Sequence, residues 1–280
     1  MVDIILDTLL DGLKLIPFLL LAFFIIELFE HKYSKKSKKF ISKSGKFGPF
    51  IGALVGAFPQ CGFSVAATNL YVTRIISLGT LISVYLSTSD EMIPVLISEQ
   101  AEASLIIEVV LIKVLLGMIY GFIIDLLLRK KQKNAQNYSL CEDDHCDCEH
   151  NLFLSALKHT FKTLSFIIAI TFILNLLFAY LGEDTLSSMF IKNSIFAPFI
   201  TSLVGLIPNC GASVMITELY IKGVLTIGST IGGLLTGSGV ALLVLFRQNK
   251  SIKENIMILF IVYLLGSLTG LIFNILGVIL

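Results

Sequence analysis

One segment of this chain occurs twice, and this repetition constrains the fold more than any other feature. Gly48-Pro-Phe-Ile-Gly-Ala-Leu-Val-Gly-Ala-Phe-Pro-Gln-Cys-Gly recurs as Ala197-Pro-Phe-Ile-Thr-Ser-Leu-Val-Gly-Leu-Ile-Pro-Asn-Cys-Gly. The offset is constant, as Pro59 and Pro208 illustrate (208 − 59 = 149), and no insertion interrupts the match. A fixed period indicates two copies of one folding unit. We therefore expect a first repeat over residues 1–128, a linker over 129–153 and a second repeat over 154–280.

The composition places these units in a membrane. Of 280 residues, 55% are hydrophobic and only 15% are charged, and the mean hydropathy is +0.88, which is too apolar for a soluble domain. A helix that crosses a bilayer needs about 20 apolar residues. Runs of that length lie at 9–30, 75–97, 103–128, 160–182, 224–246 and 255–280. The sequence predicts an all-α polytopic membrane protein whose first run stays in place as a transmembrane helix, because acidic rather than basic residues precede it.

Basic clusters set the expected orientation in the cell (inner) membrane. Seven lysines lie within residues 31–46, which places this loop in the cytoplasm and the N-terminus outside. The linker 129–153 begins with a second basic cluster that also favours the cytoplasm. If Gly48–Tyr71 were one proline-kinked helix, three crossings would separate the clusters and put the second one outside. A re-entrant hairpin leaves only two crossings, so the charge bias favours the hairpin, with the kinked helix as the alternative.

The hairpin has a consequence for symmetry. Each repeat then contains three crossing helices plus one re-entrant Pro-x-Cys-Gly helical hairpin, and an odd number of crossings inverts the second repeat relative to the first. Two inverted repeats are typical of secondary transporters, whose substrate sites lie near the midplane where broken helices meet. Backbone groups freed at Pro59 and Pro208 must be buried in protein or line a wet cavity, because lipid cannot satisfy them.

Polar residues inside the apolar runs mark the expected pathway. Ser87-Thr-Ser-Asp-Glu91 lies in the middle of the run after the first hairpin, and intramembrane carboxylates by default indicate a substrate or proton pathway. Alternatively, Asp90 and Glu91 cap a helix end or pair with Lys113. The equivalent Thr236-Gly-Ser-Gly239 keeps the hydroxyls and lacks the acids, so the acidic function is expected in one half only.

Five cysteines fall into two groups. Cys61 and Cys210 occupy equivalent hairpin tips, where the alternative to metal binding is packing as small apolar residues. The other three lie in the cytoplasmic linker, where thiols stay reduced and a disulfide framework is not expected. Together with two histidines and several carboxylates they suit thiophilic or borderline divalent metal ions, although a solvated acidic linker is the simpler alternative. The accessory metal ligands predicted in this linker are Cys141, His145, Cys146, Cys148 and His150.

These motifs together resemble one known family. The doubled Pro-Gln-Cys-Gly-Phe-Ser and Pro-Asn-Cys-Gly-Ala-Ser, the Ser-Thr-Ser-Asp-Glu and Thr-Gly-Ser-Gly stretches and the Cys/His-bearing linker look like the ten-segment heavy-metal exporters, labelled arsenic efflux protein or manganese transporter. The resemblance covers nearly the whole chain. It implies ten helical segments, which equal three crossings plus two hairpin arms in each repeat. Because the labels disagree, the resemblance implies a metal exporter without fixing the metal.

The sequence therefore predicts a secondary-active transporter, not an enzyme, that exports a heavy or transition metal ion through a midplane site between the hairpins. Cys61, Cys210, Asp90 and Glu91 are the expected core metal ligands. No Walker A motif is present, so a proton or sodium gradient is the expected energy source. The residues predicted to line the substrate and ion pathway are Gln60, Cys61, Ser64, Asn209, Cys210, Ser213, Ser87, Ser89, Asp90, Glu91, Thr236 and Ser238.

Two other functions fit parts of this pattern. An ion-coupled transporter of an anion or small organic metabolite would hold its negative group at the helix N-termini after the two hairpin tips. A membrane enzyme or metal sensor is the second alternative, although no histidine lies in a hairpin tip or at the centre of a secure span. The expected partners are the lipid bilayer, the metal ion and the coupling proton or sodium ion. No tightly bound cofactor and no nucleic acid are expected, and the sequence leaves a homo-oligomer open.

Overall fold

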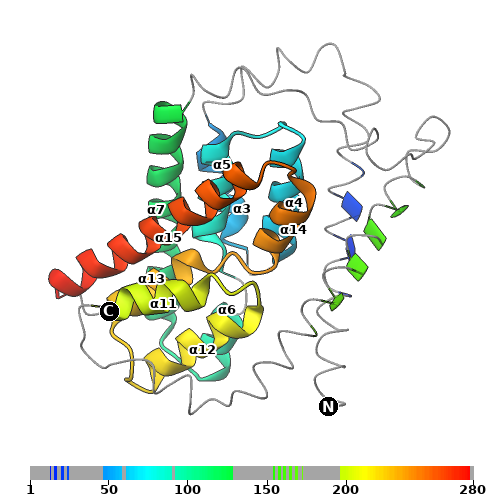
Figure 1. The fold of residues 1–280 in the computed structure, drawn as a ribbon. Helices are drawn as coiled ribbons and strands as arrows, with labels where there is room; N and C mark the ends of the chain where they lie inside the picture. Colours follow the sequence, from blue (N-terminus) through cyan, green and yellow to red (C-terminus); the bar gives the residue numbers. More distant parts are fainter. Residues whose placement is uncertain are drawn as a thin grey trace.

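The computed structural model describes residues 47–58, 61–89, 92–128 and 196–277, and isolated positions within 13–24 and 154–172; for Cys61, Ser98 and Cys210 only the backbone is described. Within these residues every element of regular secondary structure is a helix (Figure 1). The first half contains α3 (Gly48–Gly56), α4 (Cys61–Val72), α5 (Leu78–Ser87), α6 (Met92–Ser98) and α7 (Ala103–Leu128). The second half contains α11 (Ala197–Gly205), α12 (Cys210–Ile221), α13 (Ile227–Thr236), α14 (Ala241–Gln248) and α15 (Ile252–Ile275).

The helices of the two copies begin at equivalent residues. The bounds of α11, α12 and α13 are those of α3, α4 and α5 at the offset seen in the sequence, and α14 and α15 begin at the equivalents of Met92 and Ala103. Three segments among the described residues are helical, long and apolar enough to cross a membrane: Ala103–Leu128, Ile227–Gln248 and Ile252–Ile275. The second of them consists of α13 and α14 together. The expected spans at 9–30 and 160–182 and the linker 129–153 lie outside the described residues or are described only at isolated positions.

Two of the expected spans contain a break in the helix, which the sequence analysis did not predict. The run 75–97 divides into α5 and α6, and the run 224–246 divides into α13 and α14. In the first break, the hydroxyls of Ser87 and Thr88 bond back to the carbonyls of the preceding turn, and such bonds compete with helix continuation. In the second break, Gly239 has a φ of 56°, a left-handed conformation that glycine adopts without a steric penalty.

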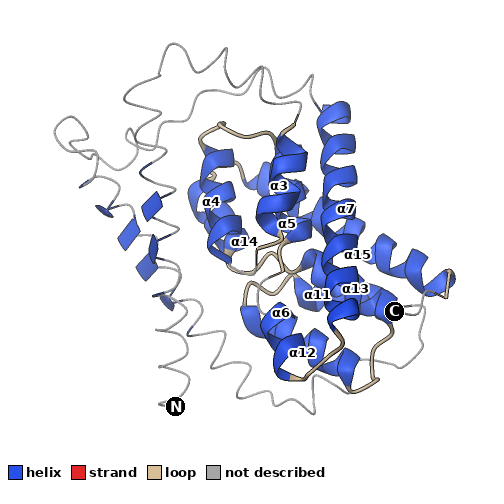
Figure 2. Ribbon diagram, turned by 180° about the vertical axis from the view of Figure 1, so that it is seen from behind, coloured by secondary structure: helices blue, strands red, loops and turns tan. Residues whose placement is uncertain are grey.

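Glycines bring α5 into direct backbone contact with its neighbours. A Cβ at Gly48 would meet the side chain of Thr80, and one at Gly56 would meet Ser87, so α3 lies along α5 in the same direction. On α4, Thr68 bonds to Tyr85 of α5, and a short connection then leads from the end of α4 into the start of α5. Helix α4 therefore runs opposite to α5 and also opposite to α3 (Figure 2).

At the interface between the two halves, helices of one half pack against helices of the other. Helix α4 of the first half packs against α14 of the second, and α12 of the second half packs against α6 of the first, as both views show (Figures 1 and 2). The hydroxyls of Tyr120 and Thr269, which are equivalent residues of the two copies, bond to each other at 2.7 Å. When equivalent residues of two copies touch, any two-fold axis that relates the copies passes between them. The contact thus marks the centre of the interface.

Candidate functional site

A buried polar cluster lies where α4, α5 and the break between α13 and α14 meet. Ser64 Oγ donates to the Ser238 carbonyl at 3.5 Å, which joins the first helix turn after one Cys-Gly pair to the broken helix of the other repeat. The hydroxyls of Thr68 and Tyr85 bond at 2.6 Å, and the Tyr85 hydroxyl also donates to the Ala241 carbonyl at 3.5 Å. Ser64, Thr68, Tyr85 and Ser238 are each 0% exposed. The sequence analysis predicted Ser64 and Ser238 but missed Tyr85, which lies in an ordinary apolar run.

The first helix break holds a lysine. Lys113 of α7 is only 1% exposed, and its ammonium donates a hydrogen bond to the Thr88 carbonyl at the end of α5. A cation at this place stabilises the negative end of the α5 dipole and satisfies a carbonyl that no helical amide reaches. The predicted pathway residues Ser87 and Ser89 are buried on either side of Thr88. Asp90 and Glu91 lie outside the described residues.

The second break holds no charged side chain at the equivalent place. The residue that corresponds to Lys113 is Val262, which is 0% exposed. Thr236 and Ser238, both predicted pathway residues, are fully buried. Ser238 Oγ has no hydrogen-bond partner in the part of the chain that the structure describes. A buried hydroxyl without a partner costs about 1–3 kcal/mol. The two breaks therefore differ: Lys113 satisfies a carbonyl of the first, whereas a hydroxyl of the second has no partner among the described residues.

The helices that carry the predicted cysteines are placed, although the thiols themselves are not described. Cys61 begins α4 and Cys210 begins α12. Asn209 caps α12, since its side-chain oxygen accepts a hydrogen bond from the Gly211 amide at 3.2 Å, and Ser213 is half-buried one turn further on. Gln60 lies outside the described residues, as do all five predicted ligands of the linker. Within the described residues no group of three or more His, Cys, Asp or Glu side chains could hold a metal ion.

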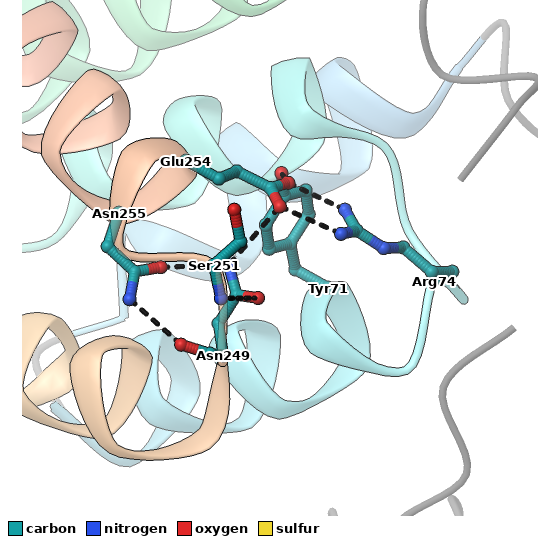
Figure 3. A network of polar contacts seen from close by, with 6 residues as sticks. All are labelled: Tyr71, Arg74, Asn249, Ser251, Glu254 and Asn255. Atoms are coloured by element: carbon teal, nitrogen blue, oxygen red, sulfur yellow. Dashed lines mark hydrogen bonds and ion pairs between the residues drawn. The ribbon is translucent and has the colours of Figure 1, made fainter. Parts of the chain in front are cut away.

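A second polar network, near the surface, connects the two halves. The two terminal guanidinium nitrogens of Arg74 donate to the Glu254 carboxylate, at 2.7 and 2.8 Å, and the Tyr71 hydroxyl donates to the same carboxylate (Figure 3). Asn249 and Asn255 hold the neighbouring turn of α15 in place. The bonds to Glu254 raise the pKa of Arg74 above its usual value, so this side chain remains charged. No pattern in the sequence indicates this pair, because Arg74 and Glu254 come from different repeats.

Arg74 also holds an unusual backbone conformation. Its φ is 61°, and its amide bonds to the Tyr71 carbonyl in a helix-ending motif that usually contains glycine. The second repeat has Gly223 at this position, with a φ of 68°. A non-glycine residue costs about 1 kcal/mol in this conformation. The two bonds to Glu254 offset this cost.

We expect Glu254→Gln to lower the thermal stability of the detergent-solubilised protein clearly. Arg74 and Glu254 are only 24% and 19% exposed, so the variant leaves a partly buried arginine without a counter-charge, at a cost of about 1–3 kcal/mol. The matched control is Lys222→Gln, which breaks the Lys222–Glu218 pair, whose side chains are 61% and 36% exposed. Exposed pairs of this kind contribute well under about 1 kcal/mol. Equal shifts in melting temperature for the two variants would contradict this account.

The broken apolar helices define a helical membrane protein whose two repeated halves meet at a buried polar cluster. A family model described as "Putative, 10TM heavy-metal exporter" matches residues 1–151 and again residues 148–278. The chain belongs to this family, as the sequence motifs predicted, and the family's description is that of a membrane exporter. No curated protein matches the chain. No solved structure matches it either.

Proposed function

We propose that this protein is a secondary-active transporter that exports a heavy or transition metal ion through a site between two re-entrant hairpins. The observation that carries the proposal is the contact between Ser64 and Ser238, which joins a Cys-bearing hairpin arm of one repeat to the helix break of the other. Broken helices that meet across a repeat interface are the usual setting of transporter substrate sites. The family membership supplies the expected class of substrate.

The directions of the helices support the re-entrant hairpins. Since α3 and α4 run in opposite directions, the chain enters and leaves this pair at the same end, beside the start of α5. The Arg74–Glu254 pair supports inversion of the repeats. Arg74 lies in the connection between α4 and α5, and its partner Glu254 lies at the start of α15. In the second repeat, the equivalent connection, between α12 and α13, is separated from the start of α15 by the full span of α13 and α14. With Arg74 on the cytoplasmic side, as the basic clusters indicate, this end of α15 is cytoplasmic too.

In the proposed site, the thiolates of Cys61 and Cys210 bind the metal, supported by the amides of Gln60 and Asn209 and the hydroxyls of Ser64 and Ser213. Thiolate ligands favour soft and borderline metals. Asp90 and Glu91 lie between α5 and α6 in the sequence, and they balance the charge of the cation or carry the coupled proton. The hydroxyls of Ser87, Ser89, Thr236 and Ser238 line the pathway on either side. The linker ligands Cys141, His145, Cys146, Cys148 and His150 form an accessory site that delivers or senses the ion.

Transport of an anion or organic metabolite is the competing function. It would use the free amides at the N-termini of α4 and α12 to hold a negative group. The Asn209 side chain already occupies the Gly211 amide at the start of α12, which disfavours an anion there.

The two functions differ in which ligands stabilise the purified protein. Bound ligand raises the unfolding temperature by mass action, by about 2.7 kcal/mol at a hundredfold excess over the dissociation constant. We expect thermal shifts with thiophilic or borderline divalent metals and none with a panel of organic anions. The Cys61→Ser/Cys210→Ser protein serves as control and should lose the shift. Stabilisation by an organic anion, unchanged in this variant, would overturn the metal assignment in favour of the competing function.

A further inference from the structure

We propose that the break between α13 and α14 binds a sodium ion, which occupies the place that the Lys113 ammonium takes in the first repeat. The proposal concerns a site distinct from the metal site. Its role as the coupling ion rests on the proposed transport function, but its binding does not.

The backbone of this break presents unpaired acceptors. The Ser238 amide bonds to the Thr236 carbonyl rather than to that of Leu234, so the regular helical ladder ends with the bond from the Gly237 amide to the Gly233 carbonyl. Among the described residues no amide bonds to the carbonyls of Leu234, Leu235 or Gly237. Carbonyls at the C-terminal end of a helix point along its axis, with the negative end of the helix dipole, and here they point towards the break. Carbonyl groups at the ends of broken helices are the usual ligands of coupling sodium ions.

The first repeat shows which kind of group this geometry accommodates. There, the ammonium of Lys113 bonds to the Thr88 carbonyl, the equivalent of the Gly237 carbonyl in the second repeat. A monovalent cation thus occupies the end of α5 permanently, because it is tethered to α7. In the second repeat α15 carries Val262 instead, which cannot reach or satisfy a carbonyl. The helix of the second break ends at the equivalent residue, Thr236 in place of Ser87, but without the tethered cation.

The polar side chains of the second break fit a small hard cation. Ser238 Oγ is fully buried and has no partner among the described residues, so it is available as a ligand. Ser64 Oγ donates to the Ser238 carbonyl at 3.5 Å, so a hydroxyl of the first repeat lies beside this break. Hydroxyl and carbonyl oxygens are hard ligands, unsuited to the soft metals that thiolates bind. Neutral oxygens also suit one positive charge better than two, since a divalent ion would need carboxylates to offset its desolvation.

The test is sodium-dependent thermal stabilisation of the full-length protein in detergent, at constant ionic strength and with choline replacing sodium. We expect a saturable rise in melting temperature with sodium. Ser238→Ala should weaken the apparent sodium affinity about tenfold, the loss expected if the hydroxyl contributes about 1.4 kcal/mol. Ser267→Ala, a change at a fully buried serine whose hydroxyl bonds within α15, should leave the sodium response unchanged. Val262→Lys should abolish the response, because the introduced ammonium takes the place of the ion.

Each outcome bears on the site itself. The same melting temperature in sodium and choline, or equal effects of Ser238→Ala and Ser267→Ala, would overturn the proposal. If Val262→Lys does not fold, the wild-type titration and the two serine variants still decide the question. A sodium shift without any metal shift would contradict the metal assignment alone, whereas a metal shift without a sodium shift would contradict only the sodium site and leave a proton as the coupling ion.

Discussion

Gly79→Ala is expected to destabilise the protein severely, by about 3 kcal/mol or more. A Cβ at this position would clash with the carbonyl oxygen of Gly121 on α7 and would lie 2.5 Å from the Asp125 carboxylate. That carboxylate accepts hydrogen bonds from Ser77 Oγ and from the Gly79 amide, at 2.6 and 2.8 Å. The added methyl group therefore forces α5 and α7 apart and breaks the bonds that hold the start of α5. Overpacking alone costs about 1–3 kcal/mol, and the lost bonds to a charged acceptor add to it.

Gly211→Ala is the matched control. A Cβ there would find its nearest neighbour, the Asn209 side chain, at 3.7 Å, which is ordinary van der Waals contact. Glycine lowers helix stability by about 0.5–1 kcal/mol relative to alanine, so this variant should be neutral or slightly stabilised. Thermal melts of both proteins by fluorescence-detected gel filtration would separate them. Similar melting temperatures for the two variants would show that α5 and α7 do not pack through Gly79 and Gly121.

The second large effect is expected in transport. In proteoliposomes, Cys61→Ser/Cys210→Ser should reduce the flux of a thiophilic metal by at least about tenfold and that of a hard divalent metal far less, because loss of the soft ligands removes more than about 1.4 kcal/mol of selective stabilisation. Asp90→Asn/Glu91→Gln should reduce the flux of both metals, since an uncompensated cation in a site of low dielectric constant is strongly destabilised. The comparison of two metals in one preparation controls for reduced expression. Wild-type flux in both double variants would show that the site has been misassigned.

The repeated sequence predicted two copies of one folding unit, and the helices of the two halves do begin at equivalent residues. The pairs Pro49/Pro198 and Pro59/Pro208 stand at the same places in both copies. The helix breaks were not predicted. Hydropathy averages over about 20 residues, and the hydroxyl side chains around Thr88 or the glycines around Ser238 hardly lower such an average. Their effect is local, through back-bonding to the preceding turn in one case and a left-handed glycine in the other.

Contacts between the repeats could not be predicted either. The pairs Ser64–Ser238 and Arg74–Glu254 join residues more than 170 positions apart, and no periodicity links such partners. Lys113 was noted only as a possible partner of the acids, yet a lysine in a long apolar run is by itself a signal of an internal polar contact. The two breaks differ because Lys113 donates to the carbonyl at the end of α5, whereas the equivalent Val262 has no polar group. The sequence shows both residues but not the contact that Lys113 makes.

The central claim, that this chain exports a metal ion by using an ion gradient, is tested most directly by flux in proteoliposomes that contain the purified wild-type protein. A panel of metals would be measured with imposed proton and sodium gradients, each in both directions, and with protein-free vesicles as the blank. The account predicts metal flux that depends on the protein and is accelerated when a proton or sodium gradient is imposed. Metal flux equal to that of protein-free vesicles for every metal and gradient, with the protein shown to be folded, would contradict it.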